Sequence, residues 1–219
     1  MREERLTFRQ IALWTLLLFS FGCGVSGCSL GAASPAMRGQ ELFQNCLPCH
    51  QPDGSGNAAI GAPNISGMPV WYVQEELDKF REGARGMEFN DIEGMRMRPV
   101  AASLLSEEDV KLVAAYVGSM PQVRHEPTLP GDPKAGAALY ATCAACHGNK
   151  GEGNVTLKAP QLAGVADWYL ATELRKYRSG ERGTSPLDRE GHMMRPMALT
   201  LPNEDAIRNV VAYIGILKP

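Results

Sequence analysis

The sequence lacks the features of several common protein classes. Its longest apolar stretch, residues 11–21, has 11 residues, fewer than the roughly 20 that cross a bilayer as a helix. A formal net charge of −2 is too small to suggest a nucleic-acid-binding protein. No segment of useful length alternates apolar and polar residues as a half-buried strand does, and no βαβ pattern is present. These absences, together with 23 glycines and 15 prolines, favour an all-α fold with long loops.

The first 27 residues have the pattern of an export signal. Three arginines precede the apolar stretch, as in a signal peptide. The segment "VSGC", which ends at Cys28, resembles the bacterial lipobox, and this resemblance implies cleavage before Cys28 and acylation of its sulfur. A secretory signal cut near "GAAS" and an uncleaved anchor are the alternatives. Each predicts a mature chain outside the cytoplasm, and Ser29 after the lipobox favours the outer membrane.

Four of the six cysteines form two short motifs, "CLPCH" and "CAACH". The other two are Cys23, within the export signal, and Cys28. Disulfides are the common use of four remaining cysteines in an exported protein. The histidine that follows each pair indicates a different use.

The chain contains an internal repeat. A shift of 97 residues places the motif at 46–50 on the motif at 143–147 and needs no gap over some 80 residues. The same shift superposes further identical residues: Gly39 on Gly136, Pro63 on Pro160, Glu76 on Glu173, Arg85 on Arg182, and Arg98 and Pro99 on Arg195 and Pro196. Because a chance similarity would not keep its phase so long, the chain is a duplicated domain.

The two repeats cover residues 36–120 and 133–219. The segment between them, 121–132, is rich in proline, lacks apolar periodicity and predicts a semi-rigid extended linker. Each repeat has fewer than 90 residues, which is small for a self-sufficient core. A covalently bound cofactor would stabilise such a unit.

Each repeat has a helical pattern. A first helix runs into the cysteines, a second covers 71–83 or 168–180 and ends at glycine, and the last begins with Ser106 or Asn203 as N-cap. Apolar residues lie on one face of each last helix: Val110, Val113, Val117 and Met120, and Ile207, Val210, Ile214 and Leu217. Tyr116 and Tyr213 are expected to pack the last helix against the first.

C-x-x-C-H is the attachment signature of c-type haem. Two thiols three residues apart on a helical turn can reach the vinyl groups of one porphyrin, and the next residue points its imidazole at the iron. A redox C-x-x-C would occur in a thioredoxin-like fold, a zinc site needs four ligands closer together, and a disulfide needs no histidine. Two motifs in phase with the repeat predict two haem c groups. The thioether and iron-binding residues are Cys46, Cys49, His50, Cys143, Cys146 and His147.

Each repeat resembles a small class I cytochrome c, and the whole chain resembles the dihaem cytochromes c of the cytochrome c4 type. The resemblance rests on the two C-x-x-C-H motifs, on "GAPNISG" and "KAPQLAG", on "WYVQEELDKFREGARG" and "WYLATELRKYRSGERG", and on "AAYV" and "VAYI". It covers nearly the full mature length. It implies helices wrapped around each haem, histidine and methionine on opposite sides of the iron, and transfer of single electrons.

The repeat indicates which methionines bind iron. Within "GHMMRPMAL", only Met194 falls on a residue of its own kind, Met97, and each is followed by Arg-Pro. The resemblance also places the ligand several residues before the N-cap of the last helix. Met97 and Met194 are the predicted sixth ligands, and His192 is the alternative at the second haem.

Further residues are expected around the haems. The resemblance implies that the backbone carbonyls of Pro63 and Pro160, each 13 residues after the histidine, accept its Nδ1–H and fix the ring. Tryptophans and arginines at matching positions are candidates for contacts to the anionic haem propionates. They are Trp71, Trp168, Arg81, Arg178, Arg85 and Arg182.

A haem with both axial positions filled has no open site for a substrate, so the predicted function is electron transfer. A thioether ligand favours ferrous iron and raises the reduction potential. We expect a periplasmic carrier, held at the membrane by its lipid, between a dehydrogenase or quinol-oxidising complex and a terminal oxidase or reductase. A cytochrome subunit of a larger redox enzyme, and a dihaem peroxidase, which must open one coordination site, are the alternatives.

The two repeats differ in charge. Residues 35–122 carry 7 basic and 12 acidic side chains, net −5, whereas 132–219 carry 11 and 9, net +2. Such asymmetry can orient a protein toward redox partners and makes association salt-dependent. It predicts that the two repeats face different partners.

Overall fold

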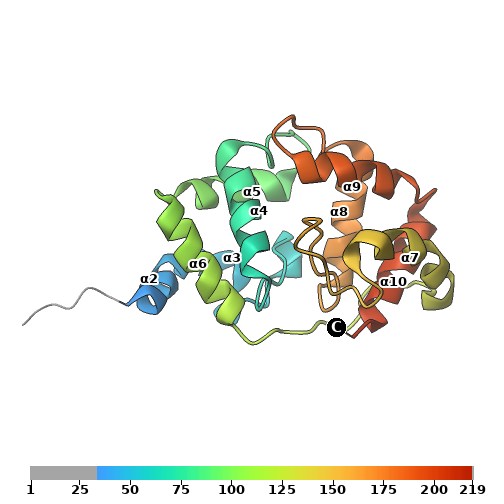
Figure 1. Ribbon diagram of the computed structural model, residues 1–219, viewed down its shortest axis with the longest axis horizontal. Helices are drawn as coiled ribbons and strands as arrows, with labels where there is room; N and C mark the ends of the chain where they lie inside the picture. The colour runs from blue at the N-terminus through green and yellow to red at the C-terminus, as the bar shows by residue number, and fades with distance from the viewer. Residues whose placement is uncertain (1–33, 219) are drawn as a thin grey trace, which may run out of the picture. The chain divides into compact units, whose positions relative to one another are not determined.

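The computed structural model describes residues 34–218 (Figure 1). The predicted export signal, Cys23 and the predicted lipidation site Cys28 lie outside the described residues. Every described residue belongs to one unit, and no helix among them is long and apolar enough to cross a membrane. The regular elements of this part of the chain are helices, with no strand, which confirms the predicted all-α class.

The helices follow the same order in both repeats. The first repeat contains α2 (Pro35–Phe43), α3 (Leu47–His50), the 3₁₀ turn η1 (Ala58–Ile60), α4 (Val70–Glu82), α5 (Ile92–Ala102) and α6 (Glu107–Ser119). The second contains α7 (Pro133–His147), α8 (Asp167–Ser179), α9 (Arg189–Leu199) and α10 (Glu204–Ile216).

The predicted helix ends are confirmed. The Ser106 hydroxyl accepts a hydrogen bond from the N–H of Asp109, and the Asn203 side chain accepts one from Ala206, so each satisfies an unpaired donor of the first turn. Both α4 and α8 end at a glycine in the left-handed region, Gly83 and Gly180.

The helix that carries the cysteines is broken in the first repeat and continuous in the second. A proline, Pro48, lies between Cys46 and Cys49, whereas Ala145 occupies the matching position in α7. Pro48 has no N–H to donate to the carbonyl of Gln44, four residues earlier. The chain therefore turns between α2 and α3, and the prediction of one continuous helix holds only for the second repeat.

Two helices, α5 and α9, were not expected. Each contains a proline, Pro99 or Pro196, inside its 11 residues. An interior proline normally predicts a helix end, because it removes one hydrogen bond of the ladder. Both helices instead begin at an aspartate N-cap and carry the methionine-rich segments.

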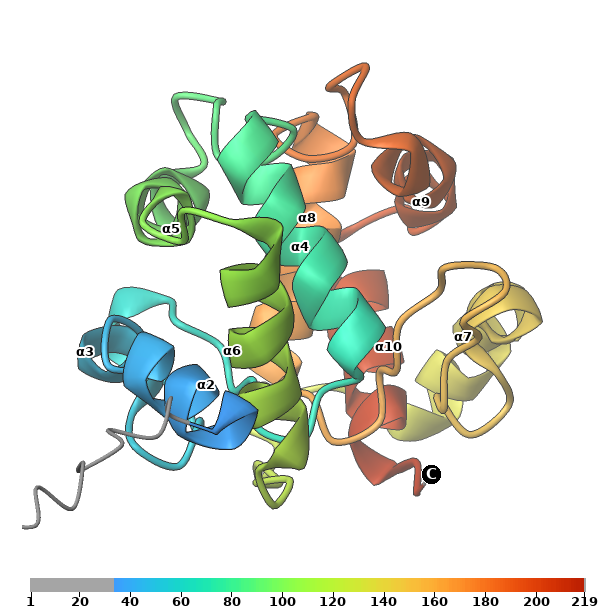
Figure 2. The same ribbon diagram turned by 60° about the vertical axis from the view of Figure 1, so that its left-hand side comes forward.

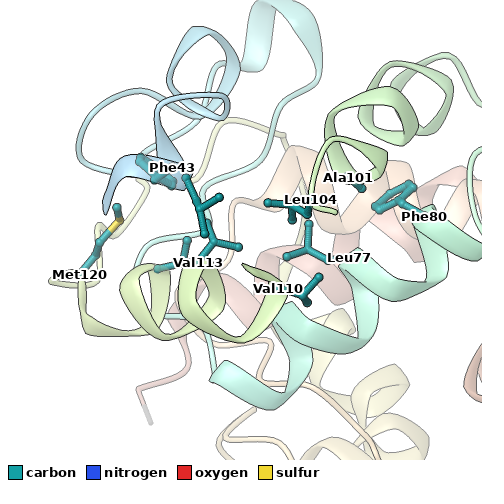
Figure 3. Packing of buried hydrophobic residues seen from close by; sticks show 10 residues of the cluster. Phe43, Leu77, Phe80, Ala101, Leu104, Val110, Val113 and Met120 are labelled. Carbon is teal, nitrogen blue, oxygen red and sulfur yellow. The ribbon is translucent and has the colours of Figure 1, made fainter. Parts of the chain in front are cut away.

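The core of the first repeat lies where α6 packs against α2 and α4 (Figure 2). Phe43 of α2 and Leu77 of α4 contact the valine face of α6, as Figure 3 shows for Val110 and Val113. The ring of Tyr116 lies 5.3 Å from that of Phe43, so the last helix packs on the first as expected.

The second core repeats this arrangement between α10 and the helices α7 and α8. Ile207, Val210 and Ile214 are buried, and the rings of Tyr140 and Tyr213 lie 5.3 Å apart. Helices α7 and α10 cross closely at Gly136, where a Cβ atom would lie 1.9 Å from the carbonyl oxygen of Asn209. Helices α2 and α6 cross in the same way at Gly39, where a Cβ atom would lie 2.5 Å from the carbonyl oxygen of Leu112.

The connecting segment, 121–132, is extended and held along its length. The backbone N–H of Val123 donates to Ser66 Oγ at 2.9 Å, and those of Thr128 and Leu129 both donate to Asp167 Oδ2 at 2.6 Å. Ser66 belongs to the first repeat and Asp167 to the second, so these bonds attach the segment to both repeats. They add to the stiffness that its prolines already give.

Candidate functional site

The histidine of each motif is buried and held by one carbonyl. His50 ends α3 with 6% of its surface exposed, and its Nδ1 lies 2.8 Å from the carbonyl oxygen of Pro63. His147 ends α7 with 7% exposed, and its Nδ1 lies 2.8 Å from the carbonyl oxygen of Pro160. Burial lowers the pKa of both imidazoles, against the opposing effect of the carbonyl, so each ring is held neutral. A neutral ring that donates from Nδ1 leaves Nε2 as a metal ligand.

A small closed loop brings each proline carbonyl to its histidine. The loop is closed by one antiparallel bridge, between Asn57 and Ala62 in the first repeat and between Asn154 and Ala159 in the second. Its backbone passes directly over Gly56, where a Cβ atom would lie 2.4 Å from the carbonyl carbon of Pro63. Gly56 also has a φ of +84°, so both the conformation and the space require glycine there.

The functional side chains of the first repeat share one cavity. Cys46, Cys49, His50 and Met97 all line it. The apolar part of the remaining wall comes from the helices of the first repeat and from residues 60–68, and charged residues, Arg85 and Lys176 among them, line another part. Burial, and secondarily the neighbouring Cys49, raises the pKa of the Cys46 thiol to about 11. Neutral sulfurs, an imidazole and a thioether around an apolar space are a donor set that fits a haem attached through two thioether bonds.

The matching residues of the second repeat lie at equivalent positions on its helices. Cys143 packs against the second core, Cys146 is exposed, and both are free thiols. Met194 lies half-buried on α9, at the position that Met97 occupies on α5. His192, the alternative ligand, is exposed, and its Nε2 lies 2.8 Å from the carbonyl oxygen of Ser185. The neighbouring Met193 and Met197 are 53% and 39% exposed.

The other predicted haem neighbours have partners within the protein. Arg81 pairs with Asp78 at 2.8 Å, and Arg178 donates to the carbonyl of Pro202. The Trp71 ring lies edge-on to Tyr72, with Lys158 Nζ 5.3 Å from its centroid, and the Trp168 ring lies edge-on to Tyr169. Of the six candidates, only Arg85 lines the described cavity.

Sequence reasoning missed a buried charge cluster that joins the repeats, formed by Glu76, Arg85, Glu173 and Arg182. Each arginine contacts the glutamate of its own repeat and that of the other. Arg85 Nη2 lies 2.9 Å from Glu173 Oε2, and Arg182 Nη2 lies 3.0 Å from Glu76 Oε2. All four residues are at most 9% exposed. The available signal was the repeat itself, because these charged residues recur in register 97 residues apart.

The charges of this cluster compensate one another. Burial raises the pKa of Glu76, but Arg182 and Arg85 outweigh it and lower that pKa to about 2. The same arginines lower the pKa of Glu173 against burial. Both carboxyl groups are therefore ionised at neutral pH, as a buried pair requires.

Comparison with known proteins gives one consistent picture. The cytochrome c family matches residues 36–121 and again 133–218. The thiosulfate dehydrogenase electron acceptor of Stutzerimonas stutzeri (strain A1501) is 31% identical over 88% of this chain and 92% of its own. Cytochrome c4 of Azotobacter vinelandii is 30% identical over 93% of this chain and 97% of its own. The crystal structure of reduced recombinant cytochrome c4 from Pseudomonas stutzeri superposes with a TM-score of 0.67 at 26% identity, covering 84% of this chain and 98% of that one.

Two tandem domains with the same fold, the same C-x-x-C-H motif and the same histidine–proline contact correspond to two c-type haems. A c-type haem supplies a one-electron Fe(III)/Fe(II) couple. The expected role as an electron carrier and not an enzyme agrees with the cytochrome c4 relatives. The chain belongs to the cytochrome c family, as a dihaem electron-transfer protein of the cytochrome c4 type.

Proposed function

We propose that His50 and Met97 bind the iron of the first haem, and that His147 and Met194 bind that of the second. The observation that carries the first pair is that His50 and Met97 line the same cavity as the two cysteines of the motif. The second pair follows from the 97-residue repeat and from the matching positions of Met97 and Met194 on α5 and α9.

The surroundings of the second repeat favour Met194 over its neighbours. His192 uses its Nε2 toward Ser185 and is exposed, so it would have to break this bond and turn inward to reach a buried iron. Met193 and Met197 are also more exposed than Met194, which is half-buried.

The proline carbonyls support the proposed histidine ligands. Each accepts the Nδ1–H of its histidine, which fixes the ring and increases its basicity toward iron. Among the arginines predicted from the sequence, Arg85 is the one that lines the cavity of the first repeat. Trp71, Trp168, Arg81 and Arg178 remain proposals as outer neighbours of the haems.

The ligand proposal is tested by absorption spectroscopy of the ferric protein. A methionine–iron bond gives a weak far-red band, and Met97→Ala and Met194→Ala should each remove about half of it, because two such bonds contribute. His192→Ala is the matched control from the same helix and should leave the band intact. A band that survives both methionine substitutions would refute the assignment.

We further propose that the carrier works in the periplasm, tethered by a lipid on Cys28, between a respiratory donor and a terminal oxidase or reductase. The export signal and the lipobox-like segment support the tether, and Ser29 favours the outer membrane. Labelled fatty acid should be incorporated into the wild type and not into Cys28→Ala, which should keep its signal segment and migrate as a larger precursor. Label in Cys28→Ala would contradict the tether.

A second candidate is a dedicated electron acceptor for a thiosulfate dehydrogenase. The similarity to the acceptor protein of Stutzerimonas stutzeri over nearly both full lengths favours it. Stopped-flow mixing of the ferric protein with a thiosulfate dehydrogenase and thiosulfate should give rapid reduction of both haems. A rate no greater than that with thiosulfate alone would leave the respiratory carrier as the better proposal.

A further inference from the structure

The two helices that carry Met97 and Met194 begin at buried aspartates. Asp91 caps α5 by accepting the N–H of Gly94 at Oδ1, and Asp188 caps α9 by accepting that of Gly191, each at 3.0 Å. Their exposed fractions are 1% and 0%. A carboxylate removed from water to this degree needs a cationic partner as well as the N–H groups of the helix end.

That cationic partner comes from the other repeat in both cases. Lys176 of α8 places Nζ 2.5 Å from Asp91 Oδ1 and 2.9 Å from Glu93 Oε2. Lys79 of α4 places Nζ 3.0 Å from Asp188 Oδ1 and 3.1 Å from Glu190 Oε2.

Each lysine also contacts a member of the buried charge cluster in its own repeat. Lys176 lies 3.5 Å from Glu173, and Lys79 lies 3.4 Å from Glu76. Both lysines are nearly buried, with side-chain exposures of 6% and 11%. The crossing contacts are therefore shielded from solvent, where a charge-assisted hydrogen bond is strongest.

These helices are short and depend on tertiary contacts, which include the burial of Ala101 and Ala198 as well as the lysine contacts at their N-caps. Each has 11 residues and contains a proline that removes a backbone hydrogen bond, and isolated helices of this length are marginal in water. The contacts of α5 with other helices are mainly with α4, and those of α9 mainly with α8. The methionine follows the capping aspartate by six residues in both helices, so movement of the cap displaces the methionine.

We propose that Lys176 positions the iron-binding methionine of the first repeat and Lys79 that of the second, each by holding the N-cap aspartate of the other repeat's methionine helix. This inference rests on the proposed ligands Met97 and Met194. Lys176 also lines the cavity of the first repeat, next to α5. Methionine coordination at each haem thus depends on the domain that carries the other haem.

The test uses the full-length holoprotein in its ferric state and titrates it with imidazole, which competes with methionine for iron. The amplitude lost from the far-red band gives the apparent affinity for imidazole. Each titration is repeated in Met97→His and in Met194→His, where the remaining band reports only the other haem, so the affinity is assigned to one haem. Lys176→Met should raise the imidazole affinity of the first haem about tenfold, the effect of losing one charge-assisted hydrogen bond, and leave the second within about twofold. Lys79→Met should do the reverse.

Lys158→Met is the matched control. Lys158 also crosses between the repeats, since it pairs with Glu75 and lies over Trp71, but it touches neither N-cap. It should change neither affinity. Asp91→Asn keeps a capping oxygen and loses the charge, so it should reproduce the Lys176→Met effect at the first haem, and the double variant should add little.

The possible results separate the inference from the ligand assignment. Four results would each overturn the inference. In a lysine variant, the imidazole affinity could rise equally at both haems, rise only at the haem of the lysine's own repeat, or not change. The fourth result is the same effect in Lys158→Met. If Met97→His or Met194→His leaves the far-red band undiminished, the ligand assignment itself is wrong.

Discussion

Arg85 Nη2 of the first repeat lies 2.9 Å from Glu173 Oε2 of the second, and both side chains are buried. Glu173 also accepts a hydrogen bond from Arg182 Nη1 at 2.5 Å, so one carboxylate contacts both buried guanidinium groups. The two domains are therefore joined by buried ion pairs, and the loss of one side chain leaves its partners with uncompensated charge.

Glu173→Gln should destabilise the protein strongly. The substitution leaves Arg85 and Arg182 with one carboxylate between them in a buried site, and breaking such a group typically costs about 3 kcal/mol or more. Urea unfolding of the ferric holoprotein, followed by circular dichroism, measures the free energy of unfolding. Glu204→Gln, which removes the exposed ion pair with Arg175, is the control and should cost less than about 1 kcal/mol. Equal losses in the two variants would contradict the role given to the cluster.

The charge cluster should also make stability depend on pH in the acid range. An unfolded glutamate protonates near 4.5, whereas the pKa of Glu76 in the folded protein is about 2. Below about 4.5 the unfolded chain binds more protons, so the contribution of Glu76 is complete above that pH and is lost as the pH falls toward 2. Urea unfolding at several pH values should show this loss in the wild type and a shallower one in Glu76→Gln. Parallel curves would show that Glu76 contributes nothing.

Much of the fold could be predicted because the repeat displays each local pattern twice. The N-caps Ser106 and Asn203 and the apolar faces of α6 and α10 follow from residue type and spacing alone. The helices α5 and α9 could not be predicted, because Pro99 and Pro196 oppose helix formation locally. Tertiary contacts at their N-caps compensate, and these contacts come from lysines some 85 to 109 positions away in the sequence.

The site was predictable where the motif fixes the chemistry. The spacing in C-x-x-C-H identifies the cysteines and the histidine, and the contacts of His50 with Pro63 and of His147 with Pro160 lie where the resemblance implied. The buried charge cluster was not predictable in the same way. The resemblance suggested haem propionates as partners of Arg85, whereas its partners in the structure are Glu76 and Glu173, which only the folded chain brings together.

The close helix crossings predict which glycines tolerate a methyl group. In Gly136→Ala the new Cβ would lie 1.9 Å from the Asn209 carbonyl oxygen, which forces α7 away from α10. Overpacking of this kind costs about 1–3 kcal/mol, so the midpoint of thermal unfolding should fall by several degrees. Gly215→Ala on α10 is the control, because its nearest contact is Pro127 at 3.5 Å, and it should be neutral or slightly stabilising. A stable Gly136→Ala would mean that the helices separate without loss of packing.

The loop at Gly56 should tune one haem and not the other. In Gly56→Ala the Cβ atom would lie 2.4 Å from the Pro63 carbonyl carbon, and the residue would keep a φ of +84°, so the carbonyl must move away from His50. A weaker bond at Nδ1 makes the imidazole a poorer donor to ferric iron, which raises the reduction potential by roughly 30–60 mV, up to a tenfold change in a one-electron equilibrium. A redox titration followed in the haem absorption measures both potentials. Gly153→Ala makes the same change at the Pro160 loop and should raise the other potential instead; a shift of both potentials in either variant would show that the carbonyl does not act locally.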